Sequence, residues 1–327
     1  MLPQRPCECS QPSSQLTLSC FLSFPLCGFA SLLRSFVSQG IDTIEKLRAA
    51  AASDPPKAIL SEQQMVGLRI YEDLLMPIPR EEVEKIGDVV KGCANEILPG
   101  SETCVMGSYR RGKAKSNDVD CLIYHKDYHD CTPLGVLMRI AERLKQQGFI
   151  TDHLSCPSNP ARVPEGKLDG KPLKKEPVSK AGQTYMGVCR VDGIHRRVDI
   201  KFYPANKKAF AQLHFTGNAS FNRGMRLYAL RIGYMLTDHG LYKKYGTALG
   251  RRQHEDSKGV SLVANSEREI FKHMGLEFVE PKDRNAYDST PHWWRGEGKH
   301  GRRGKFGGGG GGRRQDEQDE QQSPGQA

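Results

Sequence analysis

Residues 103–123 combine an apolar strand, a Gly-Ser turn and two aspartates, and this segment constrains the chain more than any other. The strand-type run ends at Gly107 and Ser108, which can present backbone N–H groups and a hydroxyl to a phosphate. Asp118 and Asp120 then alternate along a second strand-type run, so both carboxylates are expected on one face of a sheet. Two carboxylates beside a phosphate cradle predict a Mg²⁺ site for phosphoryl chemistry.

A third aspartate strengthens this prediction. Asp199 lies inside the apolar run Val198–Phe202, directly after two arginines. Aspartate is disfavoured inside strands, so three in such settings indicate a chemical role. Arg111 follows the Gly-Ser turn and offers a rigid fork of donors for a triphosphate. This combination is typical of nucleotidyltransferases in the broad sense.

Charge and cysteine usage narrow the class of protein further. The 327 residues carry a formal net charge of +10, which favours polyanionic partners such as nucleic acid. None of the ten cysteines forms a CxxC pair, which argues against a disulfide scaffold or a zinc finger. His125, His129 and Cys131 form the group most like a metal site, but a solvated loop explains them better than zinc.

The regular part of the chain predicts an α+β fold, with a mixed sheet and flanking helices. A capped helix is expected after Asp42 or Thr43, and a longer amphipathic helix from Arg80. Helices are also expected around Leu137, over 221–230 and over 267–273. The expected strands are 103–107, 120–124, 185–190, 196–202 and 211–215.

Three other segments are expected to lie outside this regular fold. Residues 1–35 fit neither a signal peptide nor a membrane span and stay unassigned, disordered or aberrant. Residues 157–182 are rich in Pro, Gly and Lys and predict an exposed insertion. Residues 287–327 predict a disordered Gly/Arg-rich tail, and no membrane partner is expected.

Several ordered motifs resemble the family X DNA polymerases of the beta/lambda type. The resemblance covers roughly residues 36 to 286 and is carried by the Gly-Ser and Asp-x-Asp segment together with five further runs. These are Gly40–Arg48, Ile78–Glu82, Tyr185–Arg190, His214–Arg226 and Glu280–Arg284.

The resemblance implies a division of the chain and a nucleotidyltransferase palm. Residues 36–79 would form a small helical DNA-binding segment, 80–203 the catalytic palm and 204–286 an α/β, thumb-like subdomain that closes on the nucleotide. It also implies DNA-directed DNA synthesis on gapped or primed DNA with dNTP substrates, two Mg²⁺ ions that Mn²⁺ can replace, gap filling in DNA repair and a nuclear location. Protein partners are not indicated.

The resemblance also implies a role for individual residues. Asp118, Asp120 and Asp199 would be the catalytic, metal-holding carboxylates, with Asp199 facing the primer 3′-hydroxyl and Arg197 orienting it. The remaining roles follow the motifs: Gly107, Ser108, Arg111 and Asn117 at the triphosphate, Phe215 and Gly217 at the sugar, Asn222 at the incoming base and Arg226 at the template strand.

The chain departs from the family pattern at several positions. His214 stands where the family usually has Tyr or Trp, Ala219 resembles the lambda version, and Pro77 replaces a phosphate-binding Arg. Cys27-Gly28-Phe29 stands near where a Gly-Val-Gly hairpin is expected. Residues 1–27 show no counterpart of the amino-terminal lyase domain, so no deoxyribose-phosphate lyase activity is expected.

Two alternative functions stay open at the level of the sequence. A template-independent terminal transferase, or another nucleotidyltransferase, shares the carboxylates and the phosphate cradle, and the 157–182 insertion is compatible with it. An inactive DNA-binding remnant is the second alternative. All three carboxylates, Ser108 and Arg111 are present, which favours an active enzyme over a decayed site.

Overall fold

The computed structural model describes residues 36, 38–52, 60–157, 178–243 and 260–285. The expectations for residues 1–35, for most of the 157–182 insertion and for the 287–327 tail lie outside these ranges. None of the helices within them is long and apolar enough to cross a membrane.

Three short helices precede the main sheet: α3 (Ile44–Ala51), α4 (Glu62–Arg69) and α5 (Tyr71–Leu75). The side chain of Thr43 caps α3 by accepting from the backbone N–H of Lys46, as the sequence predicts. Helices α4 and α5 are joined to the sheet by a buried cluster of Ile70, Leu74, Leu154 and Val188. The helical segment is therefore attached to the main sheet by an apolar contact.

The central sheet has five strands in the order β2-β4-β9-β8-β6. Their bounds are Glu102–Val105 for β2, Val119–Tyr124 for β4, Ile150–Ser155 for β6, Gln183–Val191 for β8 and Ile194–Phe202 for β9. Only β4 and β9 pair in parallel, and the other neighbours are antiparallel, so the sheet is mixed as expected. The parallel pair lies at its centre.

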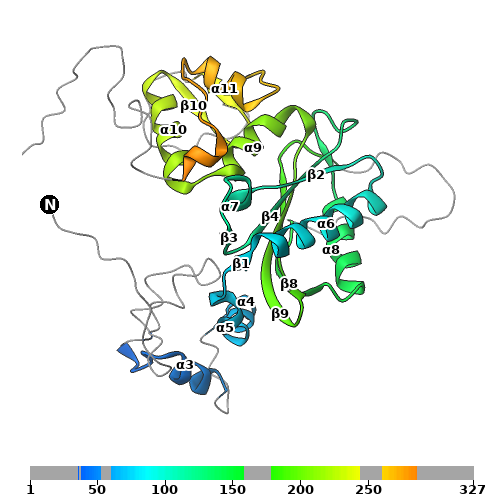
Figure 1. The fold of residues 1–327 in the computed structure, drawn as a ribbon, viewed down its shortest axis with the longest axis vertical. Coiled ribbons are helices and arrows are strands. Elements are labelled where there is room, and N and C mark those ends of the chain that lie inside the picture. The colour runs from blue at the N-terminus through cyan, green and yellow to red at the C-terminus, as the bar shows by residue number, and fades with distance from the viewer. Residues whose placement is uncertain (1–35, 37, 53–59, 158–177, 244–259, 286–327) are drawn as a thin grey trace, which may run out of the picture. The chain divides into compact units, whose positions relative to one another are not determined.

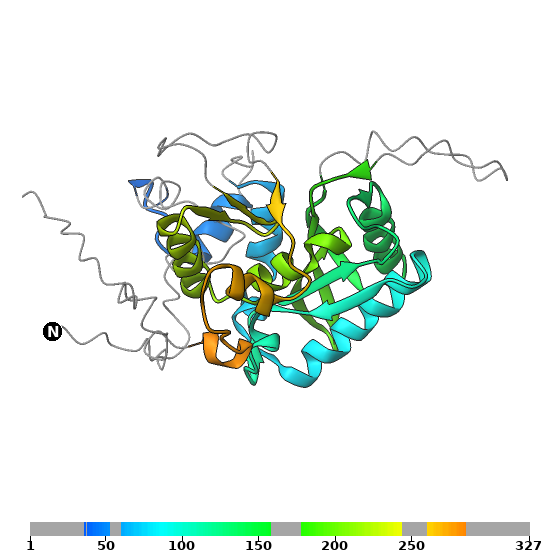
Figure 2. The same ribbon diagram turned by 90° about the horizontal axis from the view of Figure 1, so that it is seen from above.

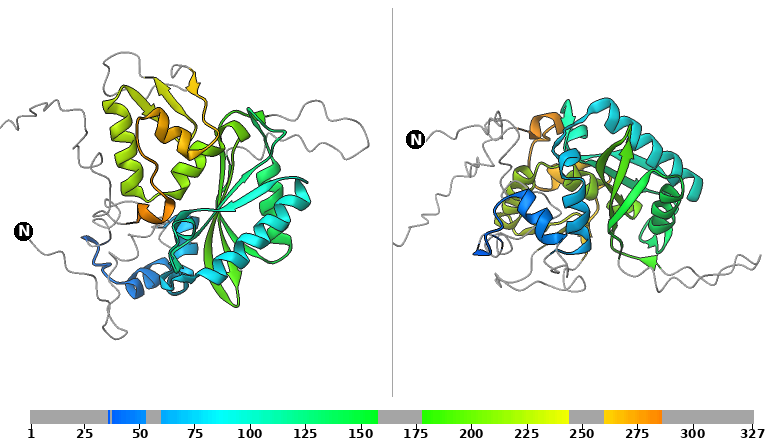
Figure 3. Two further views of the ribbon diagram at one scale, coloured as in Figure 1. Left: turned by 45° about the horizontal axis from the view of Figure 1, so that its top comes forward. Right: turned by 90° about the horizontal axis from the view of Figure 1, so that it is seen from below.

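Two amphipathic helices cover one face of this sheet, α6 (Arg80–Ile97) and α8 (Val136–Gln146) (Figures 1 and 3). Strand residues alternate between the two faces. Val119, Cys121 and Ile123 of β4 join the helix-covered core, as do their partners Val198, Ile200 and Phe202 of β9. The opposite face therefore receives Asp120 from β4 and Arg197, Asp199 and Lys201 from β9.

The last described segment forms a smaller α/β unit. It contains a three-stranded sheet in the order β10-β11-β12, and helices α10 and α11 lie beside this sheet (Figure 2). The bounds are Lys208–Thr216 for α9, Ala219–Arg231 for α10, Tyr234–Leu236 for β10, Leu241–Lys243 for β11, Ser261–Leu262 for β12 and Glu267–His273 for α11. Helix α9 packs on β4 and on the short helix α7 (Gly107–Arg110), which brings this unit to the Gly-Ser turn.

Four further short strands form two small antiparallel ladders. They are β1 (Ile78–Pro79) with β3 (Lys115–Ser116), and β5 (Thr132–Pro133) with β7 (Val178–Ser179). The first ladder ties the start of α6 to the loop before Asp118.

The prediction of a strand over 211–215 is wrong, because these residues lie in helix α9. Ala209, Phe210, Leu213 and Thr216 are buried at helical spacing, and no β-branched residue precedes Thr216 in the helix. A short apolar run does not distinguish the two states. Strand β6 was not predicted. Only Ile150 and Leu154 of this strand are buried, so its sequence shows no clear alternation, and its pairing with β8 is irregular.

Candidate active site

The centre of the sheet brings two of the three aspartates together. Asp120 of β4 and Asp199 of β9 are Cα partners across the parallel pair. Asp118 lies one residue before β4, so the expectation that it alternates with Asp120 within a strand holds only in part. The parallel register thus places two carboxylates from segments about eighty residues apart on adjacent strands, on the face that α6 and α8 leave uncovered.

Two buried cations engage these carboxylates. The guanidinium of Arg197 forms a close ion pair with Asp118, and its Nε lies 3.5 Å from Oδ1 of Asp199. Lys201 Nζ lies 2.6 Å from Oδ1 of Asp120 and 3.9 Å from Oδ2 of Asp199. The expected pairing of Arg197 with Asp199 is therefore the looser of its two contacts. The site is a network of three carboxylates and two cations.

Asp199 is the most buried of the three aspartates, with only 7% of its surface exposed. Its burial raises its pKa, the charges of Arg197 and Lys201 oppose the rise, and Asp120 adds to it. Its Oδ1 has no hydrogen-bond partner among the described residues. A buried carboxylate oxygen that accepts no hydrogen bond is suited to be a ligand of a cation.

The carboxylates have the chemistry of a divalent metal site, although their side chains are not arranged as one in this structure. Three carboxylates supply the hard oxygen donors that Mg²⁺ prefers. Within the described ranges, no group of three or more Asp, Glu, His or Cys side chains is arranged to hold a metal ion. Arg197 and Lys201 instead form ion pairs with Asp118 and Asp120. The same finding applies to His125, His129 and Cys131.

The Gly-Ser turn packs directly against Asp120. Gly107 begins helix α7 with φ +58, and a Cβ at this position would lie 2.4 Å from Oδ2 of Asp120. The hydroxyl of Ser108 donates to Oγ of buried Ser116 at 2.7 Å. Asn117 is exposed between β3 and β4. The predicted phosphate cradle therefore adjoins the carboxylates.

Arg111 connects this cradle to the Phe-Thr-Gly turn. Its Nη1 donates to the carbonyl of Thr216 at 2.6 Å and its Nε donates to Oδ1 of Asn285 at 2.8 Å. Gly217 has φ +67, and a Cβ there would lie 3.1 Å from Nη1 of Arg111. The Phe215 ring lies against Tyr203, with Lys201 Nζ 4.8 Å from its centroid. The sugar-side and phosphate-side residues of the prediction are thus brought together.

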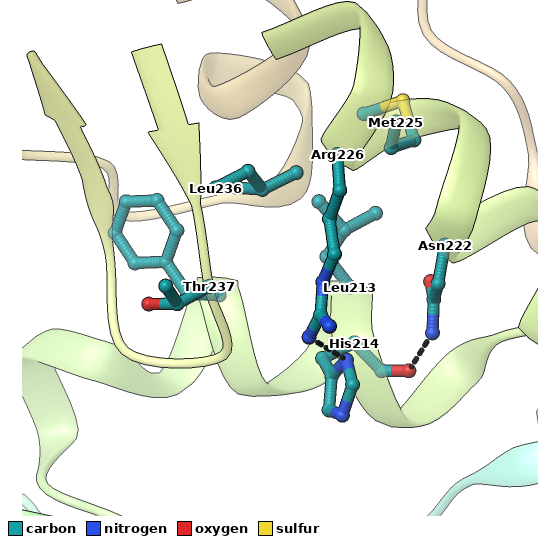
Figure 4. A pocket seen from close by; sticks show the side chains of 8 residues that line it. Leu213, His214, Asn222, Met225, Arg226, Leu236 and Thr237 are labelled. Carbon is teal, nitrogen blue, oxygen red and sulfur yellow. Dashed lines mark hydrogen bonds between the residues drawn. The ribbon is translucent and has the colours of Figure 1, made fainter. Parts of the chain in front are cut away.

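Asn222 and Arg226 are gathered around His214 rather than around the carboxylates (Figure 4). Asn222 Nδ2 donates to the carbonyl of His214 at 2.7 Å, and Arg226 Nη2 lies 3.2 Å from its Nδ1. A pocket lies between these side chains, lined also by Phe210, Leu213, Met225, Leu236 and Thr237. The residues predicted at the incoming base and at the template strand therefore both contact His214, which departs from the family pattern.

Two features of the site were not predicted from the sequence. Lys201 lies two positions after Asp199, and strand alternation would have placed both on one face. Arg110 donates to Thr216 and, at 2.6 Å, to Glu267, whose other oxygen accepts from Arg284 at 2.7 Å. No local pattern indicates this second network, because Arg110 and Glu267 lie 157 residues apart in the sequence.

Comparison with family models identifies the two regions that carry these residues. The model described as DNA polymerase beta palm matches residues 77–205, and the model described as DNA polymerase beta thumb matches residues 211–285. The three aspartates lie in the first match. The Phe-Thr-Gly turn, Asn222 and Arg226 lie in the second.

The curated proteins that are similar to this chain include three DNA polymerases. DNA polymerase lambda of Rattus norvegicus is 34% identical over 256 residues, which cover 76% of this chain and 38% of the relative. DNA polymerase lambda of Arabidopsis thaliana is 31% identical over 229 residues, covering 69% and 40%. DNA-directed DNA/RNA polymerase mu of Homo sapiens is 30% identical over 260 residues, covering 76% and 48%. The chain matches less than half the length of each.

Proposed function

The chain belongs to the family X DNA polymerases, and from this premise we propose that it is a DNA-directed DNA polymerase that adds dNTPs to a primer 3′-hydroxyl. The observation that carries the proposal is the pairing of Asp120 with Asp199 across β4 and β9, beside Gly107. Carboxylates on adjacent strands next to a phosphate cradle suit nucleotidyl transfer. Gapped DNA in repair, within the nucleus, is the proposed setting.

The proposed roles divide along the chain. Residues 36–79 would bind DNA, 80–203 would carry catalysis and 204–286 would close on the nucleotide. In the reaction, the primer 3′-oxygen would bond to the α-phosphorus as the bond to pyrophosphate breaks. Asp118, Asp120 and Asp199 would hold two Mg²⁺ ions, or Mn²⁺ in their place, which when bound would activate the hydroxyl and stabilise charge on the leaving oxygens.

The side chains around the carboxylates would bind and orient the substrates. Asp199 would face the primer hydroxyl, while Arg197 and Lys201 would exchange their present carboxylate contacts as the site fills. Ser108, Asn117 and the backbone at Gly107 would bind the β- and γ-phosphates. Arg111 would join them from the position where it now fixes the Thr216 carbonyl. Phe215 and Gly217 would lie against the sugar.

The test is extension of a primer on DNA with a one-nucleotide gap, in Mg²⁺, by this chain and its variants. We expect templated addition by the parent protein and a loss of roughly a hundredfold to ten-thousandfold in rate for Asp199→Ala. Asp88→Ala, an exposed aspartate on α6, is the matched control and should retain the parent rate.

Two outcomes of this experiment would indicate the alternative functions. Addition without a template strand would indicate a terminal transferase instead. Binding of the gapped DNA with no extension by the parent protein would indicate a DNA-binding remnant.

A further inference from the structure

His214 contacts both Asn222, which is expected at the incoming base, and Arg226, which is expected at the template strand. Its carbonyl accepts from Asn222 at 2.7 Å, and its ring Nδ1 contacts Nη2 of Arg226 at 3.2 Å. Figure 4 shows the Arg226 side chain extending from α10 to the His214 ring at the edge of the pocket. The two contacts use different parts of His214, so the ring can be changed without removing the carbonyl that binds Asn222.

The chemistry of the contact fixes the state of the ring. A guanidinium only donates hydrogen bonds, so Nδ1 of His214 must be the acceptor. The ring proton of the neutral imidazole is then on Nε2. Protonation of Nδ1 would remove the acceptor and place two positive charges 3.2 Å apart. The contact with Arg226 therefore exists only while His214 is neutral.

The surroundings of His214 favour the neutral ring. Its burial lowers its pKa, and the positive charges of Arg226, Lys201 and His239 lower it further. Asp238, in the turn between β10 and β11, is the opposing charge and raises it. These groups come from α10, β9 and the β10–β11 turn, which are the elements around the ring.

We propose that His214 is a positioning residue that holds Arg226 in the pocket and releases it to the template strand, so that this contact sets the affinity for gapped DNA. The inference rests on the proposed function, because it takes DNA as the competing ligand. Arg226 Nη2 cannot donate in the same direction to His214 and to a template base edge. Loss of the ring acceptor should therefore strengthen DNA binding through Arg226.

The first experiment is a double-mutant cycle on the equilibrium binding of fluorescent one-nucleotide-gapped DNA, measured by anisotropy without dNTP. His214→Phe should lower Kd about threefold to tenfold, which corresponds to the net contribution of one ordinary hydrogen bond. In the Arg226→Ala background the same change should have no effect. An unchanged or raised Kd for His214→Phe, or an equal effect in both backgrounds, would overturn the proposal.

Arg223 supplies the matched control. It is exposed on the same helix, one turn before Arg226, and its Nη2 contacts Ser220 rather than His214. The cycle between His214→Phe and Arg223→Ala should show no coupling. Coupling of equal size in this cycle would mean that the ring acts on the whole helix, and the specific contact would be rejected.

A conservative variant and a spectroscopic measurement complete the test. Gln at 214 can accept from Arg226 but does not titrate, so His214→Gln should keep the parent Kd at pH 8. As the pH falls well below the ordinary His value of about 6.5, the parent should bind more tightly relative to this variant, since protonated His214 releases Arg226. In the free protein, ¹⁵N shifts should show the proton of His214 on Nε2, and a proton on Nδ1 would overturn the inference without reference to DNA.

The outcome can be separated from that of the proposed function. A protein that shows the coupling and the Nε2 proton but does not extend primers supports the inference and refutes the polymerase. Normal extension with no coupling does the reverse. A parent protein that does not bind gapped DNA would overturn both.

Discussion

At the scale of single residues, the candidate active site depends on the size of the side chains that surround Asp120. Gly107 is the clearest case, because its positive φ and its contact with Asp120 both require the absence of a side chain. Lys201, by contrast, requires a long side chain, because this side chain brings its positive charge to 2.6 Å from Asp120. Gly107 thus adjoins one oxygen of this carboxylate, Oδ2, and Lys201 pairs with the other, Oδ1.

Gly107→Ala should therefore impair catalysis more than folding. The new Cβ would lie 2.4 Å from Oδ2 of Asp120, so that carboxylate must move. We expect primer extension to fall by roughly a hundredfold, in line with displacement of a catalytic group, and the free energy of unfolding by about 1–2 kcal/mol.

The control for this variant is Gly193→Ala in the β8–β9 turn. Gly193 also has positive φ (+84), but nothing lies within 4 Å of its Cβ position. It should show the loss of stability alone. Equal loss of activity in both variants would show that strain, rather than the contact with Asp120, is responsible.

At the scale of elements, a buried ionic network joins α7, α11 and the segment after it. Glu267 is 6% exposed and Arg284 is 1% exposed, and Arg284 lies among the rings of Phe221, Phe271 and Phe278. Arg110 connects the pair to the Gly-Ser helix. A charge this deeply buried is tolerated only with its partner, so the network specifies how these elements meet.

Glu267→Gln should destabilise the protein by about 3 kcal/mol, because it leaves the Arg284 charge buried without a counterion. The measurement is urea unfolding at pH 7. Glu96→Gln removes the partner of Arg143 in a pair whose side chains are 42% and 48% exposed, and should cost about 0.5 kcal/mol or less. A similar small cost for Glu267→Gln would contradict the role of the network.

The pair of Glu267 and Arg284 also predicts a pH dependence of the free energy of unfolding. Burial alone would raise the pKa of Glu267, but the hydrogen bond from Arg110 and the charge of Arg284 outweigh it and lower the pKa. A lowered pKa contributes stability that is present above the ordinary Glu value of about 4.3 and is lost as the pH falls through the folded-state value. The difference in unfolding free energy between parent and Glu267→Gln should therefore shrink below about pH 4.

At the scale of the whole molecule, the helical segment and the palm are joined by polar contacts as well as by the apolar cluster. Asp73 of α5 accepts from the backbone N–H of His195 at 3.0 Å and from its Nδ1 at 2.6 Å. Arg196 donates to Glu82 and to the carbonyl of Met76. The β8–β9 hairpin that carries Asp199 is thus the same element that anchors the helical segment.

Asp73→Ala should loosen this junction without unfolding the palm. We expect amide hydrogen exchange to become about tenfold faster in residues 62–75, which corresponds to about 1.4 kcal/mol, with β4 and α6 unchanged. Asp42→Ala, at an exposed pair with Lys46 in α3, should leave exchange in residues 62–75 as it is. Uniform acceleration across the palm would show that Asp73 supports the global fold instead.

Much of the fold could be predicted because periodicity and capping are local properties. Helix α6 follows from the spacing of Val83, Ile86 and Val90, and α3 from its Thr43 cap. Strand β9 follows from its apolar residues on one face. Helix α9 and strand β6 could not be predicted, because a short apolar run fits either state and an edge strand carries little pattern.

The sequence by itself determined the chemical inventory of this protein: three aspartates in strand-like settings, a Gly-Ser turn, an arginine fork and a Phe-Thr-Gly run, in an order typical of one polymerase family. Only the tertiary structure decided their partners. The parallel register set Asp120 opposite Asp199, and the same fold brought Lys201 to Asp120, Arg111 to Thr216 and Arg226 to His214. The physical reason is that residue type and spacing fix what a side chain can do, whereas long-range packing fixes which charges and donors it meets.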